Sequence, residues 1–281
     1  MKAIEYAEEA SEIFVLSDSF IRIKELVDDE ASTIDDIADV ILVDPALSAS
    51  ILKLANSSFF NYPGKIDTIS KAVLVLGITE VYNLVIAYFT TEAFKSLSTD
   101  TEYLEDFWER SVDCALLLRF FGDHLRVAHA ERLFLLGLLH NIGELVVKQF
   151  LPEQLLLCQI QQPSDSLADT QRKVLDFTLS DCSSELLKLW QLPFSLIEPI
   201  RHQDTDNFIV ASIETKLMYF SKRVMLRNLM FENTPIDKLV STELLTELKI
   251  NDDVLAAAKN FCDMERFSIL SILKPSSTMI F

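Results

Sequence analysis

Apolar residues recur at spacings of three and four along almost the whole chain, and few residues interrupt that pattern. The 281 residues include only 5 Gly and 8 Pro. A spacing of three and four places apolar side chains on one face of an α-helix, whereas a half-buried strand needs strict alternation. With 49% hydrophobic residues, a chain of this length can bury a substantial core. The sequence therefore predicts an all-α, multi-helical fold.

Polar residues with helix-capping preferences mark helix boundaries in the first part of the chain. Thr33 and Asp36 have the spacing of a capping box. Asp44 precedes Pro45, and proline suits the first position of a helix because its missing N–H needs no partner there. Helices are therefore predicted to begin after Thr33 and after Asp44. We expect Asn56 to end the second of them in a left-handed terminal conformation.

Glycine positions and unbroken apolar periods set the other predicted helices. Gly77 is predicted to end the helix of residues 69–76, and Thr79 is expected to cap the next one. The stretch 130–149 keeps its helical period throughout and is predicted to be one continuous helix. The remaining predicted helices cover 101–123, 152–161, 168–179, 181–191, 194–202, 207–230 and 252–272, with short pieces from 235 and 241.

The chain is acidic, with 43 Asp and Glu against 25 Lys and Arg and a formal net charge of -18. Such a surface repels a phosphate backbone, so no nucleic-acid partner is expected. The four cysteines are far apart with apolar neighbours, which predicts buried, reduced thiols. The first residues, MKAIEYAEEASEIF, lack the basic start of a signal peptide, and the longest apolar segment is interrupted by Glu80 and Asn83. We therefore expect a cytoplasmic protein without a membrane span.

Five segments, taken in order, resemble one family. They are DPALSASILKLANSSFF (44–60), IDTISKAVLVLGITEVYNLVI (66–86), FWERSVDCA (107–115), LFLLGLLHNIGELVV (133–147) and LLKLWQLPFSLIEPIRHQ (186–203). Together they resemble the HDOD domain, a degenerate relative of the HD-domain phosphohydrolases, over roughly residues 10–215. The resemblance implies an all-helical bacterial module for signalling and regulation. No enzymatic activity common to the family is implied.

The resemblance also suggests how the HD-like (HDOD) fold is divided. The polar stretch SLSTDT at 96–101 marks a soft boundary. Residues 1–98 are expected to form an N-terminal helical lobe, which packs on an HD-like helical lobe of residues 99–205. Residues 206–281 are expected to form a C-terminal helical extension that packs on this body.

The resemblance draws attention to His140 and Asn141, the polar pair inside LFLLGLLHNIGELVV. HD-type hydrolases hold one or two cations with His and Asp side chains from several helices, and the metal lowers the pKa of a water that attacks a phosphate ester. Here Asn141 stands where the resemblance implies an aspartate, and Arg110 stands where it implies a ligand histidine. A guanidinium cannot bind a cation. In place of the His-His pair of many members, the chain reads Arg201-His202.

Three roles remain open for these residues. Glu144 follows His140 by four positions, so on one helix both would face the same side and, with His202, form an incomplete metal site. Alternatively, Arg110 and His202 would bind an anion such as a phosphate or nucleotide. The third role is structural, with a buried His140 bonded to Asn141, Glu144 or a backbone carbonyl as a polar clasp between helices. The missing ligands favour the clasp, a vestige of an HD site.

The function that the sequence favours is a non-catalytic signal-transduction module that regulates by protein-protein interaction. It has no predicted catalytic residue, no cofactor and no metal, and its expected partner is another signalling protein. The alternative is a metal-dependent phosphohydrolase or phosphodiesterase with a rearranged site on His140, Glu144 and His202. A transcription factor that reads DNA with residues 70–92 is disfavoured by the net charge.

Overall fold

Every regular element in the described part of the chain is a helix, which confirms the all-α prediction. The computed structural model describes residues 2–14, 17–60, 62–95, 100–128, 130–159, 167–206, 208, 211–230 and 234–273. The chain forms two compact units, and each unit is built from two separate segments. The first unit comprises Met1–Val15 and Asp113–Lys259, and the second unit comprises Leu16–Val112 and Asn260–Phe281.

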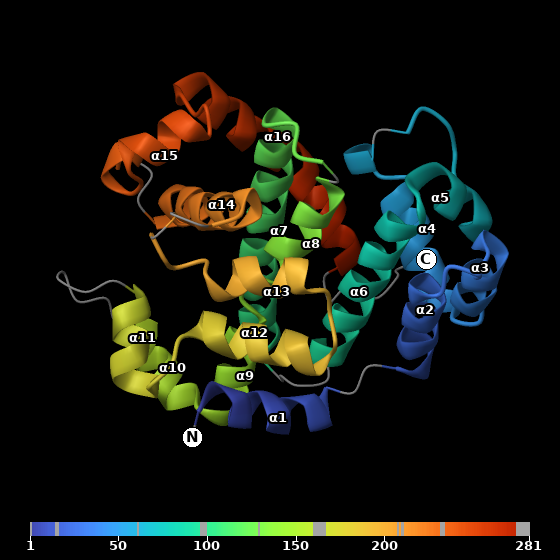
Figure 1. The fold of residues 1–281 in the computed structure, drawn as a ribbon, viewed down its shortest axis with the longest axis horizontal. Coiled ribbons are helices and arrows are strands. Elements are labelled where there is room, and N and C mark those ends of the chain that lie inside the picture. The colour runs from blue at the N-terminus through green and yellow to red at the C-terminus, as the bar shows by residue number, and fades with distance from the viewer. Residues whose placement is uncertain are drawn as a thin grey trace. The chain divides into compact units, whose positions relative to one another are not determined.

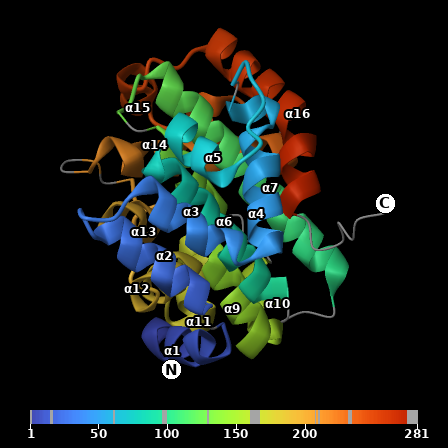
Figure 2. The ribbon, with the colours of Figure 1, turned by 90° about the vertical axis from the view of Figure 1, so that its right-hand side faces the viewer.

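The second unit is a cluster of short helices from the N-terminal part of the chain. Within it α3 packs against α2, α4 and α5, and α6 packs against α2, α4 and α5. Figure 2 shows α3, α4 and α5 side by side. The helices are α2 (Asp18–Asp28), α3 (Ile34–Leu42), α4 (Pro45–Ala55), α5 (Ile69–Leu76) and α6 (Ile78–Lys95), with a short 3-10 helix, η1, at Ser58–Phe60.

Two of the predicted N-caps in this unit, Thr33 and Asp44, are confirmed. The Thr33 hydroxyl accepts a hydrogen bond from the Asp36 N–H at 3.2 Å, and the Asp36 carboxylate accepts one from the Thr33 N–H at 2.8 Å. The Asp44 carboxylate accepts hydrogen bonds from the N–H groups of Ala46 and Leu47, both at 3.0 Å. These local bonds satisfy N–H groups that have no partner inside the helix, so α3 and α4 begin where the sequence predicts.

Asn56 ends α4, but not in the predicted conformation. Its φ of -92° and ψ of 2° lie outside the left-handed region, so that prediction is wrong. The side chain instead ties the end of α4 to the loop that follows. Its amide nitrogen donates to the carbonyls of Leu52 at 2.7 Å and Ile66 at 2.6 Å, and its amide oxygen accepts from the Ile66 N–H at 2.9 Å.

Asn56→Ala is expected to lower the free energy of unfolding by about 1–2 kcal/mol, because three hydrogen bonds are lost and the backbone groups of Ile66 lose their partners. Urea unfolding followed by circular dichroism measures the change. Ser57→Ala is the matched control, since Ser57 makes one local bond, to the Leu54 carbonyl. Equal losses in the two variants would contradict the proposed role of Asn56.

Gly77 forms the bend between α5 and α6, which meet at 119°. Its φ of +91° is accessible to glycine without strain, and its N–H donates to the Val73 carbonyl at 2.9 Å, which confirms that α5 ends here. The Gly77 carbonyl accepts from the Val81 N–H at 3.2 Å and so begins α6. The predicted cap at Thr79 is therefore wrong, because α6 already begins at Ile78.

The first unit holds the remaining helices around α12. Figure 1 shows α12 between α1 and α13, and α12 also packs against α9. Its helices are α1 (Ala3–Ile13), α8 (Glu131–Leu139), α9 (Ile142–Phe150), α10 (Pro152–Gln159), α11 (Leu167–Leu175), α12 (Leu179–Leu189), α13 (Phe194–Arg201), α14 (Ile213–Met230), the short 3-10 helix η2 (Ile236–Lys238) and α15 (Thr242–Glu247). Two helices, α7 (Thr101–His124) and α16 (Asp252–Leu273), have residues in both units.

Burial accounts for the most apolar part of the first unit. The stretch Arg132–Phe150 is long and apolar enough to cross a membrane, but 78% of it is buried inside the protein, as the core helices of soluble proteins are. All four cysteines are buried and free, as predicted. Burial, together with the nearby carboxylates of Asp181 and Glu185, raises the pKa of the Cys182 thiol to about 12, so this thiol is inert at neutral pH.

Candidate functional site

The predicted helix over residues 130–149 is broken at His140 and Asn141. α8 ends at Leu139 and α9 begins at Ile142, and Asn141 between them has φ of -120° and ψ of 18°. The prediction of one continuous helix is therefore wrong. The physical reason is tertiary, because α8 packs against α13 and α14, whereas α9 packs against α1, α10 and α12. Neither set of contacts is visible in the local apolar period.

His140 is buried at this break and bonded to the backbone. The residue is only 2% exposed, and its Nδ1 lies 2.6 Å from the Gly137 carbonyl oxygen. Because a carbonyl only accepts, Nδ1 carries the proton, and Nε2 is the ring nitrogen that keeps a lone pair. The His140 carbonyl accepts a hydrogen bond from Nε2 of Gln203 at 2.8 Å. His140 is thus held at both its ring and its backbone.

Asn141 and Glu144 bind each other across the first turn of α9. The Asn141 amide donates to the Glu144 carboxylate, and the Glu144 N–H donates to the Asn141 carbonyl at 2.8 Å. Asn141 can do this as an amide, because an aspartate would carry no donor and would repel the carboxylate. The amide donor of Asn141 is therefore matched to the carboxylate acceptor of Glu144. Glu144 is buried, with 4% of the residue exposed.

Two glycines allow close packing on either side of the break. A Cβ added to Gly137 would lie 2.4 Å from the Ala115 Cα, and one added to Gly143 would lie 2.3 Å from the Leu179 carbonyl oxygen. The Gly143 N–H donates to the Ser183 hydroxyl at 2.8 Å, which satisfies one free donor at the start of α9. The two half-helices are therefore locked against the backbones of α7 and α12.

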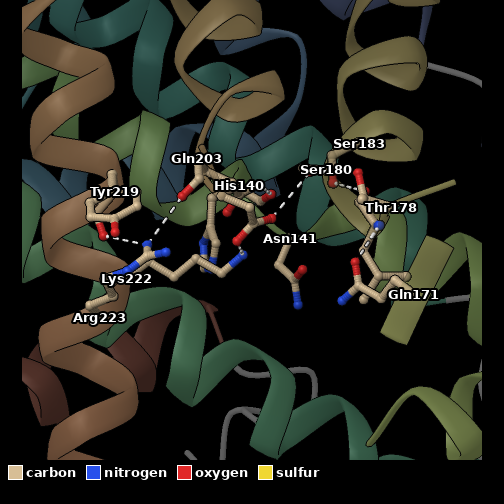
Figure 3. A network of polar contacts seen from close by, with 12 residues as sticks. His140, Asn141, Gln171, Thr178, Ser180, Ser183, Gln203, Tyr219, Lys222 and Arg223 are labelled. Carbon is tan, nitrogen blue, oxygen red and sulfur yellow. Dashed lines mark hydrogen bonds and ion pairs between the residues drawn. The ribbon is translucent and has the colours of Figure 1, made fainter. Parts of the chain in front are cut away.

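The first unit also contains a buried ion pair whose two members lie 18 positions apart in the sequence. The Lys222 ammonium on α14 lies 2.8 Å from the Asp204 carboxylate, and the two side chains are 10% and 17% exposed. The Ser180 hydroxyl donates to the second Asp204 oxygen at 3.3 Å and contacts the Thr178 hydroxyl at 2.8 Å. Figure 3 shows Gln203, which donates to the His140 carbonyl, and the extended Lys222 side chain.

A stacked arginine closes the same network. The Arg223 guanidinium lies 3.2 Å from the centre of the Tyr219 ring, and it donates to the carbonyls of Tyr219 at 3.1 Å and Gln203 at 3.5 Å. Gln203, which is 0% exposed, is thus fixed from both sides, by His140 through its side chain and by Arg223 through its backbone. The network connects α14 to the α8–α9 break.

The environment of Asp204 makes the stability of the first unit depend on pH. Burial raises the pKa of the Asp204 carboxyl, but the Lys222 ammonium, aided by Arg223 and Ser180, outweighs burial and holds the pKa below its ordinary value of 3.8. A carboxyl with a lower pKa in the folded state stabilises fully above its unfolded pKa, and this contribution is lost as the pH falls through the folded pKa.

We therefore expect wild type and Asp204→Asn to differ by a constant free energy of unfolding above about pH 4 and by a shrinking one below it. Urea unfolding at a series of pH values measures the difference, and carboxylates common to both proteins cancel. A difference that stays constant down to the acid limit of folding would contradict the assignment of the low pKa to Asp204.

His202 and Arg110 are the other two predicted site residues. His202 ends α13 and is exposed, whereas Gln203 beside it is buried. Arg110 belongs to the second unit, where its Nε donates to the Asp106 carbonyl at 3.4 Å and its guanidinium lies 6.0 Å from the Phe107 ring. Within the described ranges, no three His, Cys, Asp or Glu side chains are grouped so that they could hold a metal ion.

Residues 13–205 match the family model of the HDOD domain. The chain belongs to the HDOD family. A protein from Treponema pallidum (strain Nichols), named only as uncharacterized, is 29% identical to this HDOD protein over 206 residues, which are 71% of the chain and 39% of that relative. The chain therefore spans less than half the length of the curated relative it matches.

Solved structures share the HDOD fold. A "Putative phosphohydrolase" from Shewanella amazonensis SB2B has a TM-score of 0.72 with 21% identity, and the similarity covers 97% of both chains. A "Putative signal transduction protein" from Marinobacter aquaeolei VT8 has a TM-score of 0.69 with 21% identity, covering 94% of this chain and 59% of the other. The HDOD protein therefore shares its fold with both of these solved proteins.

Proposed function

We propose that this HDOD protein is a non-catalytic module of signal transduction that acts by binding another protein. The observation that carries the proposal is the bonding at the α8–α9 break. The Nδ1 of His140 is bonded to Gly137, and the Asn141 amide is bonded to Glu144. Glu144 is the one carboxylate of the candidate metal site of His140, Glu144 and His202, and here it accepts the Asn141 amide.

The residues present do not fit a hydrolytic metal centre. Such a centre needs three or more protein ligands and an open coordination position for water. At the break, the Asn141 amide donates to the Glu144 carboxylate, and His140 with Glu144 falls short of three ligands. The Lys222 ammonium is paired with Asp204 and would repel a metal ion placed beside that carboxylate.

A protein partner is proposed because a module without turnover transmits a signal only through what it binds. The name of the Marinobacter relative connects this fold with signal transduction, which supports the proposal for the HDOD protein. The acidic surface implied by the net charge of -18 favours a partner with a basic contact face.

The absence of catalysis is tested directly on the purified protein. We expect no metal-dependent hydrolysis of cyclic dinucleotides or of bis(p-nitrophenyl) phosphate when Mg²⁺, Mn²⁺, Fe²⁺ or Zn²⁺ is added. His140→Ala provides the comparison, and circular dichroism verifies that this variant is folded. Turnover in the wild type that is lost in folded His140→Ala would favour the alternative, a metal-dependent phosphohydrolase.

The interaction is tested with the full chain as bait in extracts of its native host, followed by titration calorimetry between the two purified proteins. We expect a signalling protein to bind with a dissociation constant in the micromolar range or tighter. Because His140 is buried, folded His140→Ala should bind the same partner equally well. A partner whose binding requires hydrolysis of a phosphodiester would overturn the proposal.

A further inference from the structure

The second unit contains a cavity of about 730 Å³ that is lined by residues of this unit alone. Its lining comes from α4, from the segments that follow α4 and precede α5, and from the C-terminal part of α16. A cavity of this volume is in the range of those that bind small molecules. Its size therefore allows a small-molecule ligand, and the side chains of the lining decide which kind.

The cavity carries positive charge, although the chain as a whole is acidic. Lys53 on α4 and Lys65 before α5 both belong to its lining, and both are exposed. Among the described residues, no carboxylate forms an ion pair with Lys53 or Lys65. Asp67 also lines the cavity, but its carboxylate lies 3.5 Å from Lys71 Nζ, so part of its charge is already balanced. In a chain with 43 acidic and 25 basic residues, this local excess of ammonium groups favours an anionic ligand.

Hydrogen bonds fix the backbone that carries Lys65 before any ligand binds. The Asn56 side chain at the end of α4 accepts from the Ile66 N–H at 2.9 Å and donates to the Ile66 carbonyl at 2.6 Å. The Lys71 ammonium donates to the Lys65 carbonyl at 2.5 Å. The segment of Lys65 is therefore joined to α4, which carries Lys53. A site whose backbone is ordered in advance loses less conformational entropy on binding.

We propose that this cavity binds a small molecule that carries phosphate groups, such as a nucleoside diphosphate or triphosphate. Ammonium groups bind phosphate through their charge, and the Ser268 hydroxyl of α16 can donate to a phosphate oxygen. Ala49 and Leu52 add apolar surface for the rest of the ligand. A nucleic acid is disfavoured, because the net charge of -18 repels a long phosphate backbone outside the cavity. The inference goes beyond the proposed function, since such a ligand would be the signal that the module receives.

The test is titration calorimetry of the full chain with ATP, GTP and pyrophosphate in about 0.15 M salt, where exposed charges are screened beyond about 8 Å. We expect at least one of them to bind the wild type with a dissociation constant of about 0.1 mM or below. Adenosine and guanosine, which lack phosphate, should not bind. Pyrophosphate that binds as tightly as the nucleotides would show that the phosphates alone are recognised, and weaker binding of pyrophosphate would show that the nucleoside contributes.

Two variants of the lining test the place of binding. Lys53→Ala/Lys65→Ala is expected to weaken binding at least about tenfold, because charge-assisted bonds to phosphate are stronger than neutral ones. Lys188→Ala/Lys238→Ala is the matched control, since it removes the same charge from exposed lysines of the first unit. Ser268→Glu places a carboxylate on the α16 side of the cavity and should abolish binding while both lysines remain. Circular dichroism verifies that each variant is folded.

Four results would overturn the inference. They are a wild type that binds none of the three phosphate compounds at millimolar concentration, an affinity that Lys53→Ala/Lys65→Ala leaves unchanged, equal losses in the two lysine variants, and a folded Ser268→Glu that binds as the wild type does. The outcome is distinguishable from failure of the proposed function, because the cavity belongs to the second unit and His140 to the first. Hydrolysis of ATP that is lost in folded His140→Ala would remove the proposed function and leave binding in the cavity as it is.

Discussion

Lys222→Met is expected to lower the free energy of unfolding by about 3–5 kcal/mol. The loss arises because the Asp204 carboxylate stays buried while its bonded cation is removed, which leaves the 3.3 Å bond from Ser180 and the attraction of Arg223. Urea unfolding followed by circular dichroism, without added divalent ions, measures the change. The double variant Lys222→Met/Asp204→Asn should regain a large part of the loss, since it leaves no buried charge unpaired.

Lys216→Met is the matched control on the same helix. Lys216 pairs with Glu247, whose side chain is 50% exposed, so water replaces the lost partner and the expected cost is at most about 1 kcal/mol. Similar losses for Lys216→Met and Lys222→Met would show that the protein is destabilised by removal of any lysine from α14. The buried pair with Asp204 would then have no special role.

The helical fold could be predicted because its determinants are local in sequence. An apolar period of three and four, the caps at Thr33 and Asp44, and the bend at Gly77 each involve residues within a few positions of one another. The break at His140 could not be predicted in this way. Apolar residues continue on both sides of it, and the reason for the break lies in different helix partners for α8 and α9.

The candidate site could be predicted only in part, for the same reason. His140, Asn141 and Glu144 stand out as polar residues within a long apolar run. Asp204 and Lys222 are 18 positions apart and pair through the fold, and neither belongs to a motif. One signal was present in the sequence, because Ser221, Lys222 and Arg223 interrupt the otherwise apolar stretch LMYFSKRVML. Lysine in such a position is almost never buried without a partner.

Which segments of the chain form each compact unit is likewise decided by tertiary contacts. α1 packs on α12 and α9, so the first residues of the chain belong to the same unit as the α8–α9 break. The C-terminal part of α16 belongs to the second unit, with α2 to α6. A linear reading of charge and linker composition carries no information about contacts between residues that lie more than a hundred positions apart.

Gly143→Ala is expected to lower the free energy of unfolding by about 2–4 kcal/mol. The added methyl group would lie 2.3 Å from the Leu179 carbonyl oxygen and 2.6 Å from the Ser183 nitrogen, and both are backbone atoms of α12. α9 must therefore move away from α12, which weakens the 2.8 Å bond from the Gly143 N–H to the Ser183 hydroxyl. The gain in helix propensity from alanine, up to about 1 kcal/mol, does not offset these losses.

Gly122→Ala separates this effect from the general response to a larger residue. A Cβ at Gly122 would lie 2.2 Å from Leu133 Cδ1, which is the end of a flexible side chain and can rotate away. The expected cost there is at most about 1 kcal/mol, because the backbone of neither helix has to shift. Thermal unfolding of both variants measures the contrast. If Gly143→Ala were as stable as Gly122→Ala, α9 would not be locked against the backbone of α12, and the two half-helices at His140 would be free to adjust.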